Sequence, residues 1–177
     1  MIQIGVMGSA ADLNYSAQTE KLAAQVGAAV ARAGCVLVYG AEQDSDSLST
    51  AAARGAKRAG GTTVGVTYGR SGDIFDPQAT DIIIRTGMER GGGREFVLVS
   101  SCDAIIAIGG GSGTLTEIAI AYQANRPIVV LDASGGWSQE LAGRFLDTRN
   151  RLRIEGARTP EDAVGLALKL QASGSTL

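Results

Sequence analysis

A glycine-rich run at residues 109–114 has the residue types best suited to binding a ligand. It follows a continuously apolar segment, residues 103–108, and precedes a segment, residues 114–124, whose apolar residues recur at helical spacing. Glycines let the backbone approach a ligand closely, and a helix N-terminus presents unpaired N–H groups to an anion. We therefore predict a phosphate-binding turn between a strand and a helix. Its residues are Gly109, Gly110, Gly111, Ser112, Gly113 and Thr114.

Glu117 lies three residues after Thr114, in what should be the first turn of the predicted helix. The helix dipole favours the ionised form of a carboxyl group there, so Glu117 could accept a ligand hydrogen bond or stabilise developing positive charge. A structural alternative is a capping box, in which Thr114 and Glu117 exchange hydrogen bonds with backbone amides. We predict that Glu117 belongs to the binding site, and to the catalytic site if the protein is an enzyme.

Arg94 is a second candidate for contact with an anion. It follows the glycines at 91–93 and begins a predicted helix that leads into the strand before the glycine-rich run. Arginine suits bidentate recognition of phosphate or carboxylate, whereas a surface arginine at a helix start is mildly disfavoured by the helix dipole. Glu95 either pairs with Arg94 or faces solvent.

Three other segments bear on the same site. Gly8 and Ser9 end the first predicted strand, Gly40 ends the second, and we predict that all three contact the ligand. The acidic stretch 42–46 would repel an anion, so the sequence favours a solvated loop over a cation site. Trp137 is expected to pack at the start of a helix.

The predicted elements alternate between short apolar strands and longer amphipathic helices. The strands are expected at 2–7, 35–39, 62–66, 81–84, 103–108 and 127–131, and the helices at 16–33, 47–59, 94–101, 113–125 and from 160 onward. Continuously apolar strands are typical of a parallel sheet covered on both faces. This pattern predicts a doubly wound, three-layer α/β fold of Rossmann type with a mainly parallel sheet, forming a single domain over residues 1–177. Ligands bind beyond the carboxyl ends of such strands, where the candidate residues lie.

The composition of the chain argues against several classes of partner, metal site and enzyme. The formal net charge of −2 argues against nucleic acid or an anionic membrane as partner. The chain shows neither a signal peptide nor an apolar stretch long enough to span a bilayer, so a cytoplasmic location is expected. It contains no histidine, which argues against a Cys/His metal site and a Ser-His-Asp hydrolase; no protein-bound metal is predicted. Cys35 and Cys102 are expected to be buried thiols without a disulfide.

The apolar segment 103–108 and the run GGGSGTLTE after it resemble the signature of the superfamily once described as lysine decarboxylase-like. This superfamily includes cytokinin-activating phosphoribohydrolases and molybdenum cofactor carrier proteins. The likeness extends to Gly8-Ser9, Tyr39-Gly40, residues 51–61 and Arg94, and it implies a Rossmann-like fold.

Two departures distinguish this chain from the phosphoribohydrolases. Their loop begins with proline where this chain has Gly109, and an Arg-Lys pair stands where this chain has Arg94 and Glu95. The residues after Gly40 are acidic here, whereas the enzymes have further glycines. The all-glycine start of the loop is more similar to the carrier branch.

The resemblance implies two functions. The first is a carrier that binds the molybdenum cofactor, a molybdopterin bearing a phosphate, and protects it for transfer to molybdoenzymes. The second is hydrolysis of a nucleoside 5′-monophosphate to free base and ribose 5-phosphate, with Arg94 and Glu117 as catalytic residues. A nucleotide sensor is a third possibility. The resemblance also implies a homo-oligomer, either dimer or tetramer.

Overall fold

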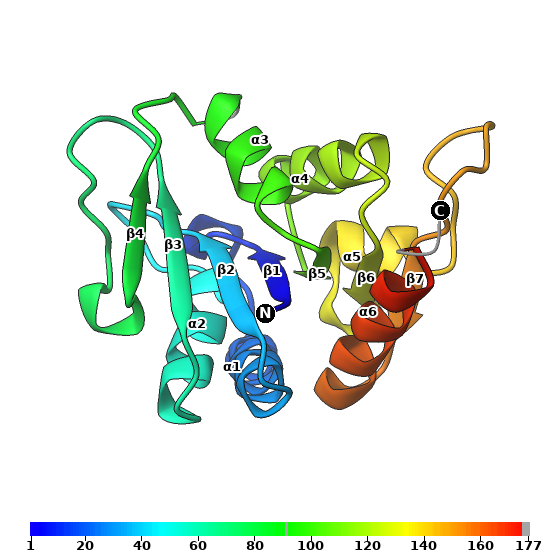
Figure 1. Ribbon diagram of the computed structural model, residues 1–177, viewed down its shortest axis with the longest axis horizontal. Helices are drawn as coiled ribbons and strands as arrows, with labels where there is room; N and C mark the ends of the chain where they lie inside the picture. Colours follow the sequence, from blue (N-terminus) through cyan, green and yellow to red (C-terminus); the bar gives the residue numbers. More distant parts are fainter. Residues whose placement is uncertain (91, 175–177) are drawn as a thin grey trace.

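The computed structural model describes residues 1–90 and 92–174, which form a seven-stranded parallel sheet between two layers of helices (Figure 1). The strand order is β4-β3-β2-β1-β5-β6-β7, and every pairing is parallel. The strands are β1 (Gln3–Gly8), β2 (Val36–Gly40), β3 (Thr63–Thr67), β4 (Ile82–Arg85), β5 (Ala104–Ile108), β6 (Ile128–Leu131) and β7 (Glu155–Ala157). The predicted doubly wound α/β fold is thereby confirmed.

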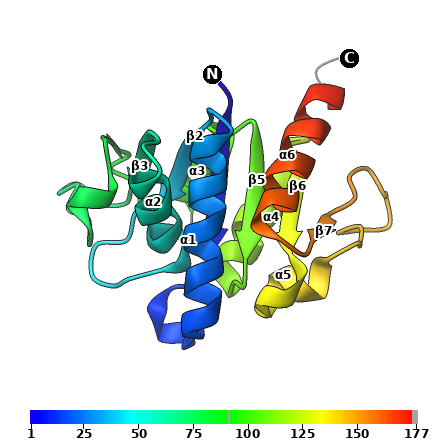
Figure 2. The same cartoon turned by 90° about the horizontal axis from the view of Figure 1, so that it is seen from below.

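The helices cover both faces of the sheet. The described helices are α1 (Ala17–Arg32), α2 (Leu48–Arg58), α3 (Gly93–Ser100), α4 (Ser112–Gln123), α5 (Gly136–Leu141) and α6 (Pro160–Gly174), with short 3-10 turns η1 (Ala11–Leu13), η2 (Pro77–Ala79) and η3 (Asp132–Ser134). Helices α1, α2 and α6 pack on one face, and α3, α4 and α5 pack on the other (Figures 1 and 2). The short βα connections all reach the edge where the strands end.

Alternation along each strand divides the core into two. In β5, which is fully buried, Ile106 and Ile108 face the layer of α1, α2 and α6, while Ile105 and Ala107 face α3 and α4. This two-sided burial explains why the strands are apolar without interruption. The two cysteines are buried free thiols, as predicted.

Local capping matches the sequence pattern at three helix starts. Ser16 and Ser47 accept hydrogen bonds from the N–H groups of residues three positions later, at 3.1 and 3.0 Å, and so cap α1 and α2. Thr159 does the same for α6 by accepting from Asp162 N–H at 3.1 Å.

The sequence prediction missed β7 and α5, which are only three and six residues long. Trp137 is the second residue of α5, so it lies at a helix start as expected, but its side chain remains 39% exposed. None of the described helices combines the length and apolar character needed to cross a membrane.

Helices α1 and α2 lie side by side (Figure 2) and approach each other closely at two glycines. A Cβ at Gly27 would lie 1.8 Å from the carbonyl oxygen of Ala52, and a Cβ at Gly55 would lie 1.9 Å from that of Ala24. Both distances are far below van der Waals contact and involve backbone, which cannot rotate away. The two glycines therefore set the separation of α1 and α2.

Gly27→Ala is expected to lower the free energy of unfolding by roughly 2–3 kcal/mol, because the helices must move apart. Gly165→Ala is the control: it lies on the exposed side of α6, where an added Cβ meets no described atom within 4 Å. That change should stabilise by roughly 0.5–1 kcal/mol through helix propensity. Urea unfolding of both variants measures the difference, and equal effects would contradict the close packing.

Candidate functional site

A cavity of about 420 Å³ opens at the carboxyl ends of the central strands. Its walls come from the segments that follow β1 and β2, from the start of α3 with the loop before it, and from the start of α4. The lining residues are Gly8, Ser9, Ala10, Asp12, Leu13, Gly40, Glu42, Ser47, Ser49, Arg90, Arg94, Glu95, Gly111, Ser112, Gly113, Thr114 and Glu117. Strands β1 and β5 are neighbours, but the chain leaves β1 toward β2 on one side and returns to β5 on the other. This is the switch point where doubly wound sheets bind ligands.

The first turn of α4 presents backbone N–H groups to this cavity. The helix begins at Ser112 with Gly111 as N-cap, and Leu115 N–H donates to Gly111 O at 3.0 Å. Residues 112–114 precede the first intrahelical acceptor that their N–H groups could reach, so these groups are open to a ligand. Because the helix starts before Thr114, that residue is not the N-cap, and the capping box considered for Thr114 and Glu117 is not formed.

Gly109 and Gly110 do not line the cavity, but they determine the backbone conformation of the turn. Both have positive φ, 63° and 104°, which glycine adopts without strain. The N–H of Gly109 donates to Ser134 Oγ and that of Gly110 donates to Ser9 Oγ, each at 2.7 Å. Of the predicted loop, the structure thus brings residues 111–114 to the cavity and uses the two preceding glycines to tie β5 to neighbouring segments.

Arg94 lies at the inner end of the cavity among three glutamates. Its side chain is 4% exposed, and its terminal nitrogens lie 3.3 Å from Glu42, 3.1 Å from Glu95 and 4.0 Å from Glu117. The arginine comes from α3 and reaches beneath the loop after β2. It is therefore a buried charge held by buried carboxylates, and the surface alternative is wrong.

Gly40 makes room for this arginine. A Cβ on Gly40 would lie 1.8 Å from Arg94 Nη1, so only glycine at the end of β2 lets the guanidinium take its position. Gly8 is similarly constrained, since a Cβ there would lie 2.7 Å from Leu48 Cβ. Both predicted glycines line the cavity, and the absence of a Cβ lets the side chains of Arg94 and Leu48 pack directly against them.

The acidic stretch 42–46 is less exposed to solvent than its sequence predicts. Glu42 is only 8% exposed and pairs with Arg94 at 3.3 Å and with Arg90 at 3.1 Å. Asp46 is paired with Arg54 at 2.8 Å. A solvated loop is thus wrong for these two residues, because Arg90 and Arg94 pair with Glu42 and Arg54 of α2 pairs with Asp46.

Of the two alternatives for Glu95, pairing with Arg94 and facing solvent, the structure shows pairing with Arg94. It is 2% exposed, its Oε1 faces Arg94, and its Oε2 accepts from Gly92 N–H at 2.8 Å at the start of α3. Both oxygens are therefore used within the protein. Of the glycine triplet before Arg94, Gly91 lies outside the described residues.

Glu117 is the carboxyl group most affected by burial. Its pKa is raised to about 8, chiefly by desolvation, with Glu95 and Glu42 adding to the rise and Arg94 opposing it. At neutral pH Glu117 is therefore protonated and can donate a hydrogen bond. Because α4 begins at Ser112, Glu117 lies beyond the first turn, so the expectation of an ionised carboxylate in the first turn is wrong in both position and charge.

Arg90 was missed by the sequence analysis. Its side chain is 53% exposed, pairs with Glu42 and lies over the ring of Tyr68, 5.7 Å from the ring centroid. The signal available was an arginine in a glycine-rich loop before Arg94, which is weak because such residues are common on surfaces. Arg90 covers Glu42 on the solvent side.

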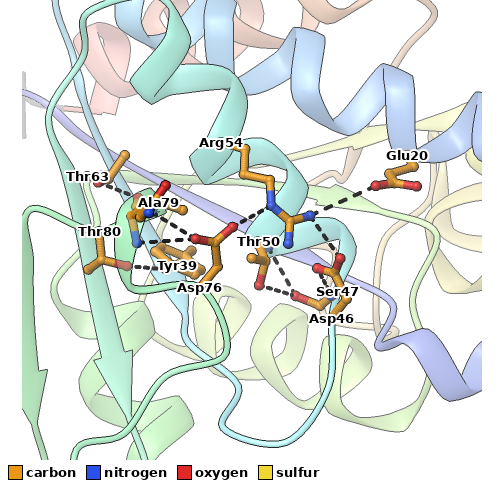
Figure 3. A network of polar contacts seen from close by, with 11 residues as sticks. Glu20, Tyr39, Asp46, Ser47, Thr50, Arg54, Thr63, Asp76, Ala79 and Thr80 are labelled. Carbon is orange, nitrogen blue, oxygen red and sulfur yellow. Dashed lines mark hydrogen bonds and ion pairs between the residues drawn. The ribbon is translucent and has the colours of Figure 1, made fainter.

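Arg54 of α2 ties the loop after β2, which lines the cavity, to the loop that carries Asp76 (Figure 3). Its Nε donates to Asp76 at 2.6 Å and its Nη1 donates to Asp46 at 2.8 Å, with Glu20 of α1 at 3.9 Å. Phe75 N–H also donates to Glu42 O at 2.8 Å, so the two loops are joined beside the cavity. We call Arg54 with Glu20, Asp46 and Asp76 the Arg54 clasp. It positions the loop that carries Glu42.

Within residues 1–90 and 92–174, no group of three or more His, Cys, Asp or Glu side chains is arranged to hold a metal ion. The cavity instead offers backbone donors, hydroxyls, two arginines, three glutamates and Asp12. These groups suit an organic anion with hydrogen-bonding functions.

Sequence comparison places the chain in a family. It belongs to the SLOG cluster4 family, whose profile matches residues 1–164. A cytokinin riboside 5′-monophosphate phosphoribohydrolase of Mycobacterium tuberculosis is 34% identical over 130 residues, which cover 67% of this chain and 65% of that protein.

Solved structures extend the likeness over nearly the whole chain. The molybdenum cofactor carrier protein of Chlamydomonas reinhardtii superposes with a TM-score of 0.79 and 31% identity, covering 97% of this chain and 98% of that one. The molybdenum cofactor binding protein of Rippkaea orientalis gives 0.76 and 31%, with 96% of each chain covered. The superfamily predicted from the glycine-rich motif is confirmed.

Proposed function

We propose that this protein binds the molybdenum cofactor and protects it for storage or transfer to molybdoenzymes. The observation that carries the proposal is the cavity itself, which joins the open N–H groups of α4 to a buried group of hydrogen-bonding side chains. Likeness to molybdenum cofactor carriers along nearly all of the chain supports it.

In this proposal the phosphate of the cofactor lies on the N–H groups of the 111–114 turn, where the helix dipole also favours negative charge. Ser9 and Thr114 line the same end, and Gly109 and Gly110 fix the shape of the turn. Arg94 and Glu117 contact the pterin side. No bond is made or broken, so affinity and exclusion of solvent constitute the mechanism. A homo-oligomer in the cytoplasm is the setting we propose.

The second candidate is hydrolysis of a nucleoside 5′-monophosphate. The protonated Glu117 near Arg94 favours it, because a neutral carboxyl group can donate a proton to a leaving base. Phosphoribohydrolase likeness over about two thirds of the chain also supports it. Glu95, a carboxylate beside Arg94, opposes it, since the resembling enzymes have lysine there.

Gly113→Asp tests the site of the phosphate. Gly113 is exposed in the first turn of α4, and a Cβ there meets no described atom within 4 Å. The aspartate should stabilise the helix by roughly 0.3–1 kcal/mol through the dipole, yet repel a phosphate and weaken cofactor binding by about 100-fold or more. Retention of cofactor per chain after anaerobic gel filtration measures the effect.

Gly113→Asn is the matched control, with the same shape and no charge, and it should retain cofactor. Loss of retention in both variants would show steric exclusion in place of charge repulsion. If the wild-type protein retains none and releases free base from nucleoside monophosphates, the enzyme is the correct function.

A further inference from the structure

The charges of the cavity are divided between its two ends. The α4 end carries partial positive charge and donor N–H groups, whereas the inner end holds Glu42, Glu95 and Glu117 around Arg94. A phosphate at the inner end would face these carboxyl groups. A ligand that uses the whole cavity must therefore be anionic at one end and rich in N–H donors at the other.

The three glutamates are not equivalent. Both oxygens of Glu95 have protein partners, and Glu117 is neutral at neutral pH. Glu42 contacts Arg94 through Oε1, but its buried Oε2 has no hydrogen-bond partner among the described residues. Glu42 is thus the one buried carboxylate of the site with an oxygen available as acceptor.

Arg90 covers that oxygen with an ion pair at 3.1 Å that lacks hydrogen-bond geometry. Its side chain is half exposed, whereas that of Glu42 is 9% exposed. A ligand N–H group that displaces Arg90 would give Glu42 Oε2 a hydrogen bond of better geometry. The displaced guanidinium of Arg90 would then be solvated by water. An acceptor atom in the same place would be repelled by the carboxylate.

We propose that Glu42 selects the ring of the ligand, by accepting hydrogen bonds from the adjacent N–H and NH2 groups of a 2-amino-4-oxopyrimidine edge. Pterins and guanine carry this pair of donors. At the same two positions adenine presents the N1 acceptor and a C2–H group, with no N–H donor, so Glu42 discriminates against it. The inference rests on the proposed function for the use of this cavity, and it adds the ring chemistry that the cavity accepts.

The test compares three nucleotides that share ribose and phosphate: guanosine, inosine and adenosine 5′-monophosphate. Inosine keeps the ring N–H but lacks the 2-amino group. Titration calorimetry of the wild-type protein at neutral pH should give the tightest binding for guanosine monophosphate, by about tenfold over adenosine monophosphate, with inosine monophosphate between them. Equal affinities, or no binding of any of the three, would overturn the proposal.

Glu42→Gln replaces one acceptor oxygen by an NH2 group and should reduce the preference for guanosine monophosphate to less than about threefold. Competition by inorganic phosphate should be unchanged, which also shows that the variant is folded. Glu161→Gln, at an exposed ion pair on α6, carries the same change of charge and should behave as wild type. If Glu42→Gln keeps the full preference, the proposal is wrong; if it fails to fold, the wild-type series decides.

The nucleotide titration and the cofactor-retention experiment can fail independently of each other. Cofactor retention with equal nucleotide affinities supports a carrier and overturns the role of Glu42. A strong preference for guanosine monophosphate without cofactor retention supports Glu42 and overturns the carrier.

Discussion

Arg94→Ala is expected to lower the free energy of unfolding by about 3–5 kcal/mol at neutral pH. The guanidinium is 4% exposed and is the shared partner of Glu42 and Glu95, with Glu117 at 4.0 Å. Its removal leaves buried carboxylates without compensation, because the other arginine, Arg90, contacts only Glu42 among them. Urea unfolding at neutral pH measures the loss.

Arg32→Ala provides the control, because Arg32 pairs with Glu161 where both side chains are more than half exposed. That change should cost less than about 1 kcal/mol. If Arg94→Ala costs no more than Arg32→Ala, the inner end of the cavity does not depend on the charge of Arg94.

Glu117→Gln is expected to stabilise the protein at high pH. The pKa of Glu117 is raised from 4.5 to about 8, so the folded state holds a proton that the unfolded state has lost. The contribution of this group is fully present below pH 4.5 and is lost as the pH rises through 8. Glutamine keeps the shape and carries no titrating proton.

The variant should therefore gain stability over wild type by up to about 1.4 kcal/mol for each pH unit within this window, which amounts to as much as about 5 kcal/mol above it. Urea unfolding of both proteins across the window gives the slope. The control is Glu161→Gln, whose carboxylate is exposed. A constant difference between Glu117→Gln and wild type would mean that Glu117 is ionised in the folded state.

Much of the fold could be predicted because its signals are local. Strands β2, β5 and β6 are apolar along their length, and Ser16, Ser47 and Thr159 mark helix starts directly. β7 was missed because three residues give no periodicity. Gly8, Gly40 and the turn after β5 could be assigned to one site because parallel strands all end at the same edge.

The inner end of the cavity could not be predicted in the same way. Glu42 lies among acidic residues, a pattern typical of solvated loops, and its burial depends on Arg94, 52 positions further along the chain. The protonation of Glu117 likewise depends on how completely α3 and the loop after β2 enclose it. Such effects belong to tertiary packing, and adjacent residues carry no trace of them.

The Arg54 clasp also bears on how a ligand reaches the cavity. One guanidinium contacts α1 and two loops, so the loop of Asp46 and the loop of Asp76 are held together as a single unit. Leu13 and Arg90, which line the same cavity, are each 53% exposed. Because neither side chain belongs to the clasp, we expect a ligand to enter past them while the clasped loops stay closed.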